Sequence, residues 1–99
     1  MPTYVFLSKL TDQGMRNVRQ APGRKNAGTK AAEQFGGRLL HWYLTIGAYD
    51  GVFVAEFPDD KAAAQFALAR SSLGNIRFTM LTAFSEAEFQ ELVETLPPE

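Results

Sequence analysis

The side chains of this sequence that can move protons gather between positions 41 and 50. His41 and Tyr43 lie two residues apart in an apolar run, and Tyr49 and Asp50 follow side by side. Imidazole, phenol and carboxylate groups serve proteins as general acids and bases. His41, Tyr43, Tyr49 and Asp50 are therefore the candidate catalytic residues.

Each candidate also has a structural interpretation. A lone histidine on a strand is often a packing residue, and an aspartate before glycine, as in Asp50-Gly51, is favoured in turns for its backbone geometry alone. Arg77 stands alone among apolar residues, so it is either an edge residue whose charge reaches water or an anchor for an anion. We take His41, Tyr43 and Arg77 as the candidate residues for binding a small organic ligand.

The composition excludes several chemistries. The chain has no cysteine, which rules out disulfide bonds, thiolate catalysis and the usual structural zinc sites. Its one histidine rules out a histidine-based metal cluster. A single histidine can ligate haem, but no motif in this sequence supports that assignment. We expect no metal and no cofactor.

Length and net charge bound the class of protein. At 99 residues the chain is expected to form a single domain over residues 1–99, and its net charge of -1 provides no field that would draw it to nucleic acid or lipid. The first residues lack the basic start and the long apolar stretch of a signal peptide, and no later stretch has the length of a membrane span. We therefore expect a cytoplasmic protein with neither nucleic acid nor membrane as a partner.

The charges are nevertheless unevenly distributed along the chain. Residues 13–32 contain basic side chains and no acidic ones, namely Arg16, Arg19, Arg24, Lys25 and Lys30. From Ser85 onward every charged side chain is acidic. Solvated helix faces would explain this pattern. Alternatively, the acidic C-terminal helix packs near the basic first helix, within one subunit or across an interface, and this is the arrangement that we predict.

Hydrophobic periodicity and turn residues place the secondary-structure elements. The expected strands cover residues 3–9, 38–46, 52–57 and 75–84, and the expected helices lie within 11–35, 58–73 and 85–96. The first helix is expected to break or kink at Pro22-Gly23, and the last to begin with a capping box formed by Ser85 and Glu88. The helix after Pro58 is expected to bury one stripe of residues: Ala62, Phe66, Ala69 and Leu73.

Strict alternation along the second strand predicts which residues share a face. One face is expected to carry Leu40, Trp42, Leu44 and Ile46, and the other Leu39, His41, Tyr43 and Thr45. The Asp50-Gly51 pair then predicts a tight reversal into the next strand. Strands joined by so short a loop must form an antiparallel hairpin.

The element order is βαββαβ with an added C-terminal helix. This order predicts an α+β, ferredoxin-like fold, in which helices cover one face of an antiparallel sheet. The first strand is apolar on both faces, with Tyr4 and Phe6 on one side and Val5 and Leu7 on the other. No element of the chain is left to cover the second face, so we expect a homo-oligomer, most simply a homodimer.

Several segments together are similar to the GYD-domain family. They are Gly36-Gly37, YLTIGAYD at 43–50, EFPDD at 56–60 and GNIRFTML at 74–81. The family takes its name from a Gly-x-Tyr-Asp turn, which Gly47, Tyr49 and Asp50 form here, and the resemblance covers residues 3–84. It implies a subunit of the dimeric α+β barrel type, from a group largely without an assigned activity. Phe57 departs from the small residue expected before Pro58.

Three functional classes remain open to the sequence. The first is a homo-oligomer that binds a small organic ligand. The second is a cofactor-free enzyme of the monooxygenase or isomerase type, such as related dimeric barrels contain, with His41, Tyr43 and Asp50 as its acid and base groups. The third is RNA binding, because the RNA-recognition motif shares the βαββαβ order. The run at 51–57 lacks the basic start of that motif and places Phe57 one residue late, which argues against RNA.

Overall fold

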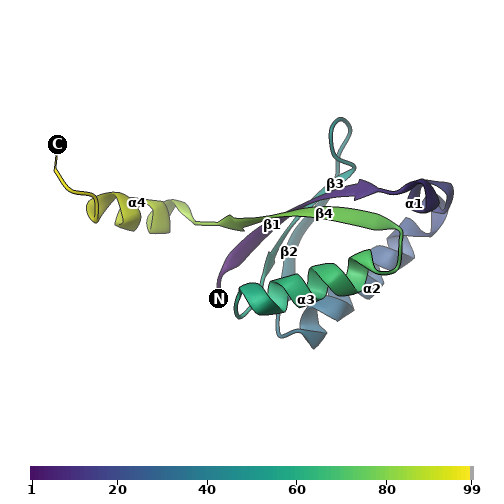
Figure 1. Cartoon of the computed structure of the whole chain (residues 1–99), viewed down its shortest axis with the longest axis horizontal. Helices are drawn as coiled ribbons and strands as arrows, with labels where there is room; N and C mark the ends of the chain where they lie inside the picture. The colour runs from purple at the N-terminus through teal and green to yellow at the C-terminus, as the bar shows by residue number, and fades with distance from the viewer. Residues whose placement is uncertain (99) are drawn as a thin grey trace.

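The computed structural model describes residues 1–98 and shows a four-stranded antiparallel sheet with helices on one of its faces (Figure 1). The strands are β1 (Thr3–Leu10), β2 (Arg38–Leu44), β3 (Gly51–Glu56) and β4 (Ile76–Ala83). The helices are α1 (Asp12–Arg16), the 3-10 turn η1 (Val18–Gln20), α2 (Ala21–Gln34), α3 (Asp60–Ser71) and α4 (Glu86–Glu94). In space the strands follow the order β2-β3-β1-β4. The predicted ferredoxin-like α+β fold with an added C-terminal helix is confirmed.

Three helices begin at side-chain caps that the sequence carries. The Thr11 hydroxyl accepts a hydrogen bond from the Gly14 N–H, and the Asp59 carboxylate accepts one from the Ala62 N–H at 2.9 Å. The predicted capping box of Ser85 and Glu88 is present, with both reciprocal hydrogen bonds formed.

The sequence predicted a break or kink at Pro22-Gly23, but Pro22 does not kink a helix in the structure. It lies in the first turn of α2, which begins at Ala21 and runs without interruption to Gln34. Proline is well accommodated there, because the first turn of a helix leaves its backbone N–H groups unpaired in any case. The expected break falls earlier, at η1.

The core lies between the sheet and α2 and α3. The Phe6 ring stacks on Phe53 with 4.6 Å between centroids, and Phe66 of α3 meets Phe6 edge-on at 5.6 Å. Edge-to-face and offset contacts of this kind are the favoured geometries of aromatic pairs. Phe57 is fully buried as well. Gly37 leaves room for its ring, since a Cβ on Gly37 would lie 2.5 Å from a ring carbon of Phe57.

The buried stripe of α3 is rotated from its predicted position. Ala62 and Phe66 are buried as expected, but Ala69 and Leu73 are exposed. Their places are taken by Ala63, which is fully buried, and by Ala67, which packs against the core. Small side chains at these positions let the helix lie close to the aromatic rings of the sheet.

A β-bulge in β2 changes the predicted faces of that strand. Leu39 pairs with Ala55 and His41 with Val54, so one extra residue, Leu40, is accommodated between them. The predicted alternation was therefore wrong for Leu39, which packs against the core. It was also wrong for Thr45 and Ile46, which lie beyond the end of β2 at Leu44, and Ile46 is 99% exposed. His41 and Tyr43 still share one face.

The predicted hairpin of β2 and β3 is antiparallel, but its turn differs from the expectation. The loop is closed by the Thr45 N–H, which donates to the Asp50 carbonyl at 3.1 Å, and by the Thr45 hydroxyl, which donates to the Tyr49 carbonyl at 2.6 Å. Gly47 has a φ of 132°, a conformation that favours glycine. Gly51 is the first, buried residue of β3, so Asp50-Gly51 is no tight reversal.

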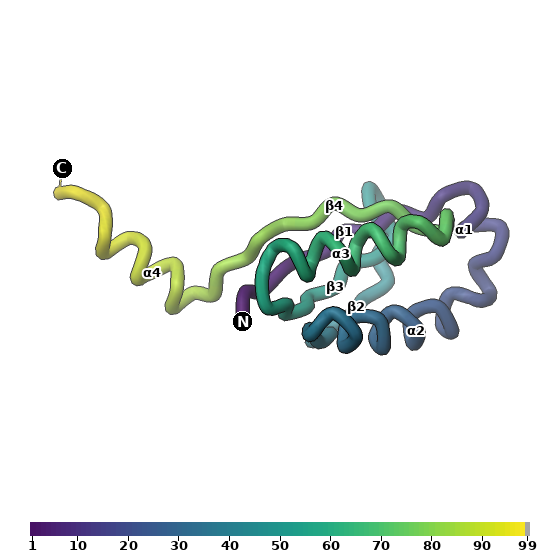
Figure 2. The backbone as a smooth tube through the Cα atoms, turned by 60° about the horizontal axis from the view of Figure 1, so that its bottom comes forward, coloured from purple at the N-terminus to yellow at the C-terminus, as the bar shows by residue number. Residues whose placement is uncertain are grey.

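Helix α4 stands clear of the other elements. Figures 1 and 2 both show it beyond the end of β4, at the opposite end of the molecule from α1. Its apolar residues Phe89, Leu92 and Val93 are exposed, and so is Leu96, two residues beyond its end. The prediction that α4 packs near the basic first helix within one subunit was therefore wrong, because β4 carries the chain away from that helix. A contact across an interface stays a prediction.

The Tyr4 phenol predicts a loss of stability at alkaline pH. Tyr4 is fully buried, and its hydroxyl donates a hydrogen bond to an Asp60 carboxylate oxygen at 2.6 Å. Burial, the hydrogen bond to Asp60 and the negative charges of Asp60 and Asp59 raise the pKa of Tyr4 to about 12. Because the unfolded value is about 10, this stabilisation is complete below about pH 10 and is lost as pH rises through about 12.

Urea unfolding of the wild type and Tyr4→Phe across this range measures the effect. The difference in unfolding free energy should shrink between about pH 10 and about pH 12. A constant difference would contradict the raised pKa.

Candidate functional site

The sheet face turned away from the helices carries a band of apolar side chains. We call this surface the open face, formed by Val5, Leu7, Val52, Val54 and Leu81. Val5 faces Val54 on one neighbouring strand and Leu81 on the other, and Leu7 faces Val52. These residues are half-buried or exposed, and no element within residues 1–98 covers them.

His41, Tyr43 and Arg77 all belong to the open-face side of the sheet, but they do not meet. His41 and Tyr43 belong to edge strand β2 and lie opposite Val54 and Val52 of β3. Arg77 belongs to the other edge strand, β4, and lies opposite Lys9 of β1. The two edge strands are separated by β3 and β1, which corresponds to about 14 Å. One small ligand therefore cannot contact all three, and their role in ligand binding stays a prediction.

Asp50 connects the end of the hairpin to β1. Its carboxylate accepts a hydrogen bond from the Leu10 N–H at 2.8 Å, and its own N–H donates to the Ser8 carbonyl at 2.8 Å. The side chain thus continues the ladder between β1 and β3 beyond the start of β3. Asp50 lies four residues along the strand from Val54, the partner of His41, or about 13 Å. The candidate set of His41, Tyr43 and Asp50 is not assembled around one point.

Tyr49 lies near Arg77 rather than near His41. Both line a shallow, open depression at one end of the sheet, together with Lys9 and Gln13. The Tyr49 phenol and the Arg77 guanidinium are hydrogen-bond donors that could contact an anion there, but the depression is too open to enclose a ligand. Within residues 1–98, no three His, Asp or Glu side chains come together in an arrangement that could hold a metal ion.

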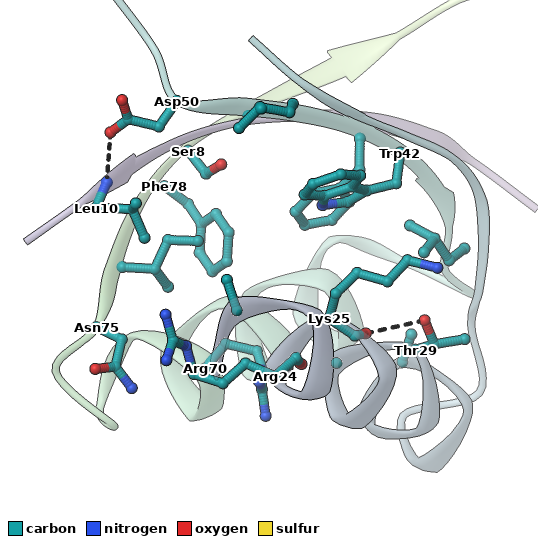
Figure 3. A pocket seen from close by; sticks show the side chains of 18 of the residues that line it. Ser8, Leu10, Arg24, Lys25, Thr29, Trp42, Asp50, Arg70, Asn75 and Phe78 are labelled. Carbon is teal, nitrogen blue, oxygen red and sulfur yellow. Dashed lines mark hydrogen bonds between the residues drawn. The ribbon is translucent and has the colours of Figure 1, made fainter. Parts of the chain in front are cut away.

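A more enclosed site lies on the other side of the sheet. Between the sheet and helices α2 and α3 is a cavity of about 150 Å³ (Figure 3). Its wall is mainly apolar and includes Leu10, Leu39, Trp42, Phe53, Phe66 and Phe78. Sequence reasoning missed this site. Its signal was the small residues that face these large ones, Gly28 and Ala32 on α2 and Gly51 and Ala55 on β3.

The cavity has charged groups on two of its walls. Asp50 lies at the sheet, whereas Arg24, Lys25 and Arg70 come from the helices (Figure 3). Arg70 is half-buried, and its Nη2 donates to the Arg24 carbonyl at 3.0 Å. Burial lowers the pKa of Arg70, and the positive charge of Arg24 lowers it further. In the part of the chain that the structure describes, neither guanidinium pairs with a carboxylate.

Comparison with known proteins gives the family. The sequence profile of the GYD domain matches residues 4–93. The chain belongs to the GYD-domain family. This confirms the resemblance deduced from the sequence motifs.

One relative in this family has a descriptive name. The chain is 34% identical over 89 residues to a protein of Thermus thermophilus named "Glutamine synthetase and cystathionine beta-lyase binding protein", with 89% of this chain and 94% of the relative covered. No solved structure was found to match the chain.

The residues that name the GYD family have identifiable structural tasks in this chain. Gly47 adopts the positive φ of the loop, the Tyr49 carbonyl accepts the Thr45 hydroxyl, and the Asp50 carboxylate accepts the Leu10 N–H. Together they stabilise the conformation of the hairpin loop and connect its end to β1 by a hydrogen bond. A catalytic role for Tyr49 and Asp50 stays a prediction.

Two substitutions at Asp50 separate its hydrogen bond from its charge. Asp50→Ala leaves the Leu10 N–H without its partner and should lower the unfolding free energy by about 1–3 kcal/mol. Asp50→Asn keeps an oxygen that can accept the same hydrogen bond, so it should retain most of the stability. Urea denaturation of the three proteins measures this. Equal losses in both variants would show that the bond to Leu10 is not what Asp50 contributes.

Proposed function

We propose that this protein is a homo-oligomeric binding protein that acts through contacts with other proteins. The apolar open face carries the proposal. A contiguous apolar surface of this kind on a small protein is typical of an interaction site. A second copy that presents the same face would cover it symmetrically, so a dimer built on the open face is the simplest assembly.

The exposed α4 supports contact with a different protein. Phe89, Leu92 and Val93 lie three and four residues apart, which places them along one side of the helix, and Leu96 follows just beyond its end. This is the pattern with which amphipathic helices enter grooves on their partners. A helix of nine residues is marginal on its own in water. We therefore assign α4 to a partner with an apolar groove and, given the acidic residues of the helix, a basic rim.

The family relative indicates which partners to test. Its name states that it binds glutamine synthetase and cystathionine beta-lyase, and the match covers nearly all of its length. We propose that enzymes of these two kinds are partners of this chain too.

The enzymatic alternative has less support. Acid and base groups must reach the same substrate by hydrogen bonds, and the separation of His41 from Asp50 does not favour this. RNA recognition by a βαββαβ sheet relies on aromatic side chains exposed on the sheet, on which bases stack. The central strands here present Val5, Leu7 and Val54 on the open face instead.

A small organic ligand is a second candidate function, and the cavity is the observation that favours it. The enclosed apolar site between the sheet and the helices fits a small ligand better than the dispersed set of His41, Tyr43 and Arg77 does.

None of the helices in residues 1–98 is long and apolar enough to cross a membrane. A cytoplasmic location stays a prediction.

Self-association through the open face is tested with charged substitutions. Light scattering of the wild type should give the mass of a dimer. Val54→Glu, in the middle of the open face, and Leu81→Lys, at its edge, should each weaken the dimer by about tenfold or more, because each leaves an unpaired charge in an apolar contact. Gln65→Glu, on the exposed side of α3, is the control and should remain a dimer. A wild type that stays monomeric would refute the assembly.

Partner binding through α4 is tested separately. The immobilised protein should bind purified glutamine synthetase or cystathionine beta-lyase from its own organism in biolayer interferometry. Leu92→Glu should weaken that binding by about tenfold or more, whereas the control Glu91→Gln should change it little. If Leu92→Glu instead abolishes dimer formation, α4 belongs to the interface between copies. Absence of binding to both enzymes would refute this choice of partners.

A further inference from the structure

The cavity between the sheet and the helices has the size and wall of a ligand site. An apolar cavity of about this volume in a protein interior can hold a benzene molecule. Here the volume is about 150 Å³, and the rings of Phe53, Phe66 and Phe78 contribute to its wall. Trp42 also lines it and is 42% exposed, so the cavity is not fully sealed from solvent.

Arg70 is the charged group best placed to select a ligand. It reaches from α3 across to α2, where its guanidinium lies against Gly28, and one of its nitrogens donates to the Arg24 carbonyl at 3.0 Å. That hydrogen bond uses one of five guanidinium N–H donors. Arg24 directs its own guanidinium to the carbonyls of Asn17 and Gly14, so it does not compete for the same ligand.

A half-buried guanidinium beside an apolar wall is a recognised setting for carboxylate binding. A guanidinium and a carboxylate form two parallel, charge-assisted hydrogen bonds, which a neutral amide cannot reproduce. Asp50 lies on the sheet side of the cavity (Figure 3), and its carboxylate already accepts the Leu10 N–H. An anionic group is therefore favoured at the helix side, near Arg70, and disfavoured near Asp50.

We propose that the cavity binds a small amphipathic carboxylate, whose carboxylate pairs with Arg70 and whose apolar body lies against Phe53, Phe66 and Phe78. The inference rests on the second candidate function, the binding of a small organic ligand, and specifies its chemical class. It is independent of the open face and of α4, because none of the residues that define those surfaces lines the cavity.

The probes are phenylacetate and hexanoate, each compared with its neutral amide, phenylacetamide and hexanamide. Trp42 provides the readout, because it is the one tryptophan of the chain and lines the cavity. Each carboxylate should change the Trp42 fluorescence in a saturable way. The matching amide should bind about tenfold more weakly, which corresponds to the loss of a charge-assisted pair.

Two variants assign the effect to the cavity. Arg70→Gln should reduce carboxylate affinity to that of the amide, and Arg19→Gln, which removes the same charge from an exposed position outside the cavity, should leave it unchanged. Gly28→Leu should abolish binding of both probes by filling the cavity. The backbone accepts a Cβ at position 28, because the nearest atoms to it are those of the Arg70 side chain, at ordinary contact distances of 3.6–3.9 Å. Thermal unfolding checks that each variant remains folded.

The outcomes separate the ligand class from ligand binding itself. If amides and carboxylates bind equally, or if folded Arg70→Gln keeps the preference, the proposed class is wrong and small-ligand binding survives. If no probe gives a saturable change, or if folded Gly28→Leu binds as well as the wild type, both the class and the cavity as a ligand site are refuted. Self-association and enzyme binding are measured independently and are unaffected by either result.

Discussion

The contact between Phe6, Phe53 and Phe66 determines the two sides of this molecule. Phe6 and Phe53 stack on neighbouring strands, and Phe66 sets α3 against them. Because side chains alternate along a strand, burying these rings on one face turns Val5 and Val54 to the other. The helix-covered core and the uncovered apolar face are thus consequences of a single register. The chain buries one face by itself and leaves the other apolar face uncovered within residues 1–98. The association that we propose depends on this uncovered face.

The helix-covered side of the sheet is not filled uniformly. The space left there is the cavity described above. Small residues on α2 and β3, such as Ala32 and Ala55, lie opposite large aromatic ones and leave a cavity between the layers. The bulge in β2 brings Trp42 and Leu39 to its wall, because the extra residue Leu40 shifts the alternation. Arg70 then supplies a positive charge with no acidic partner among the described residues. A β-bulge and a set of small side chains therefore leave a cavity in the core with Arg70 on its wall, and the proposed ligand binding depends on this cavity.

The residues that name the family link the two sides. Gly47 and Asp50 shape the hairpin loop, and the Asp50 carboxylate extends the pairing of β1 beyond Gly51, the first residue of β3. Asp50 is also one of the residues that line the cavity, so a single residue both extends the pairing of the sheet and contributes to the cavity wall. Its structural task is compatible with a further role in binding, since a carboxylate that accepts one backbone N–H retains capacity for other donors.

The sequence by itself determined the element order, the antiparallel hairpin, the helix caps and the family, because these depend on local periodicity, on Ser85 and Glu88, and on short motifs. It also showed that both sheet faces are apolar, which follows from alternation alone. Only the tertiary structure decided the β2 bulge, the rotation of α3 and the separation of His41 from Asp50. Each of these depends on packing between residues distant in the chain, which local patterns do not encode. The cavity was hidden for the same reason: it exists only where α2, α3 and the sheet come together.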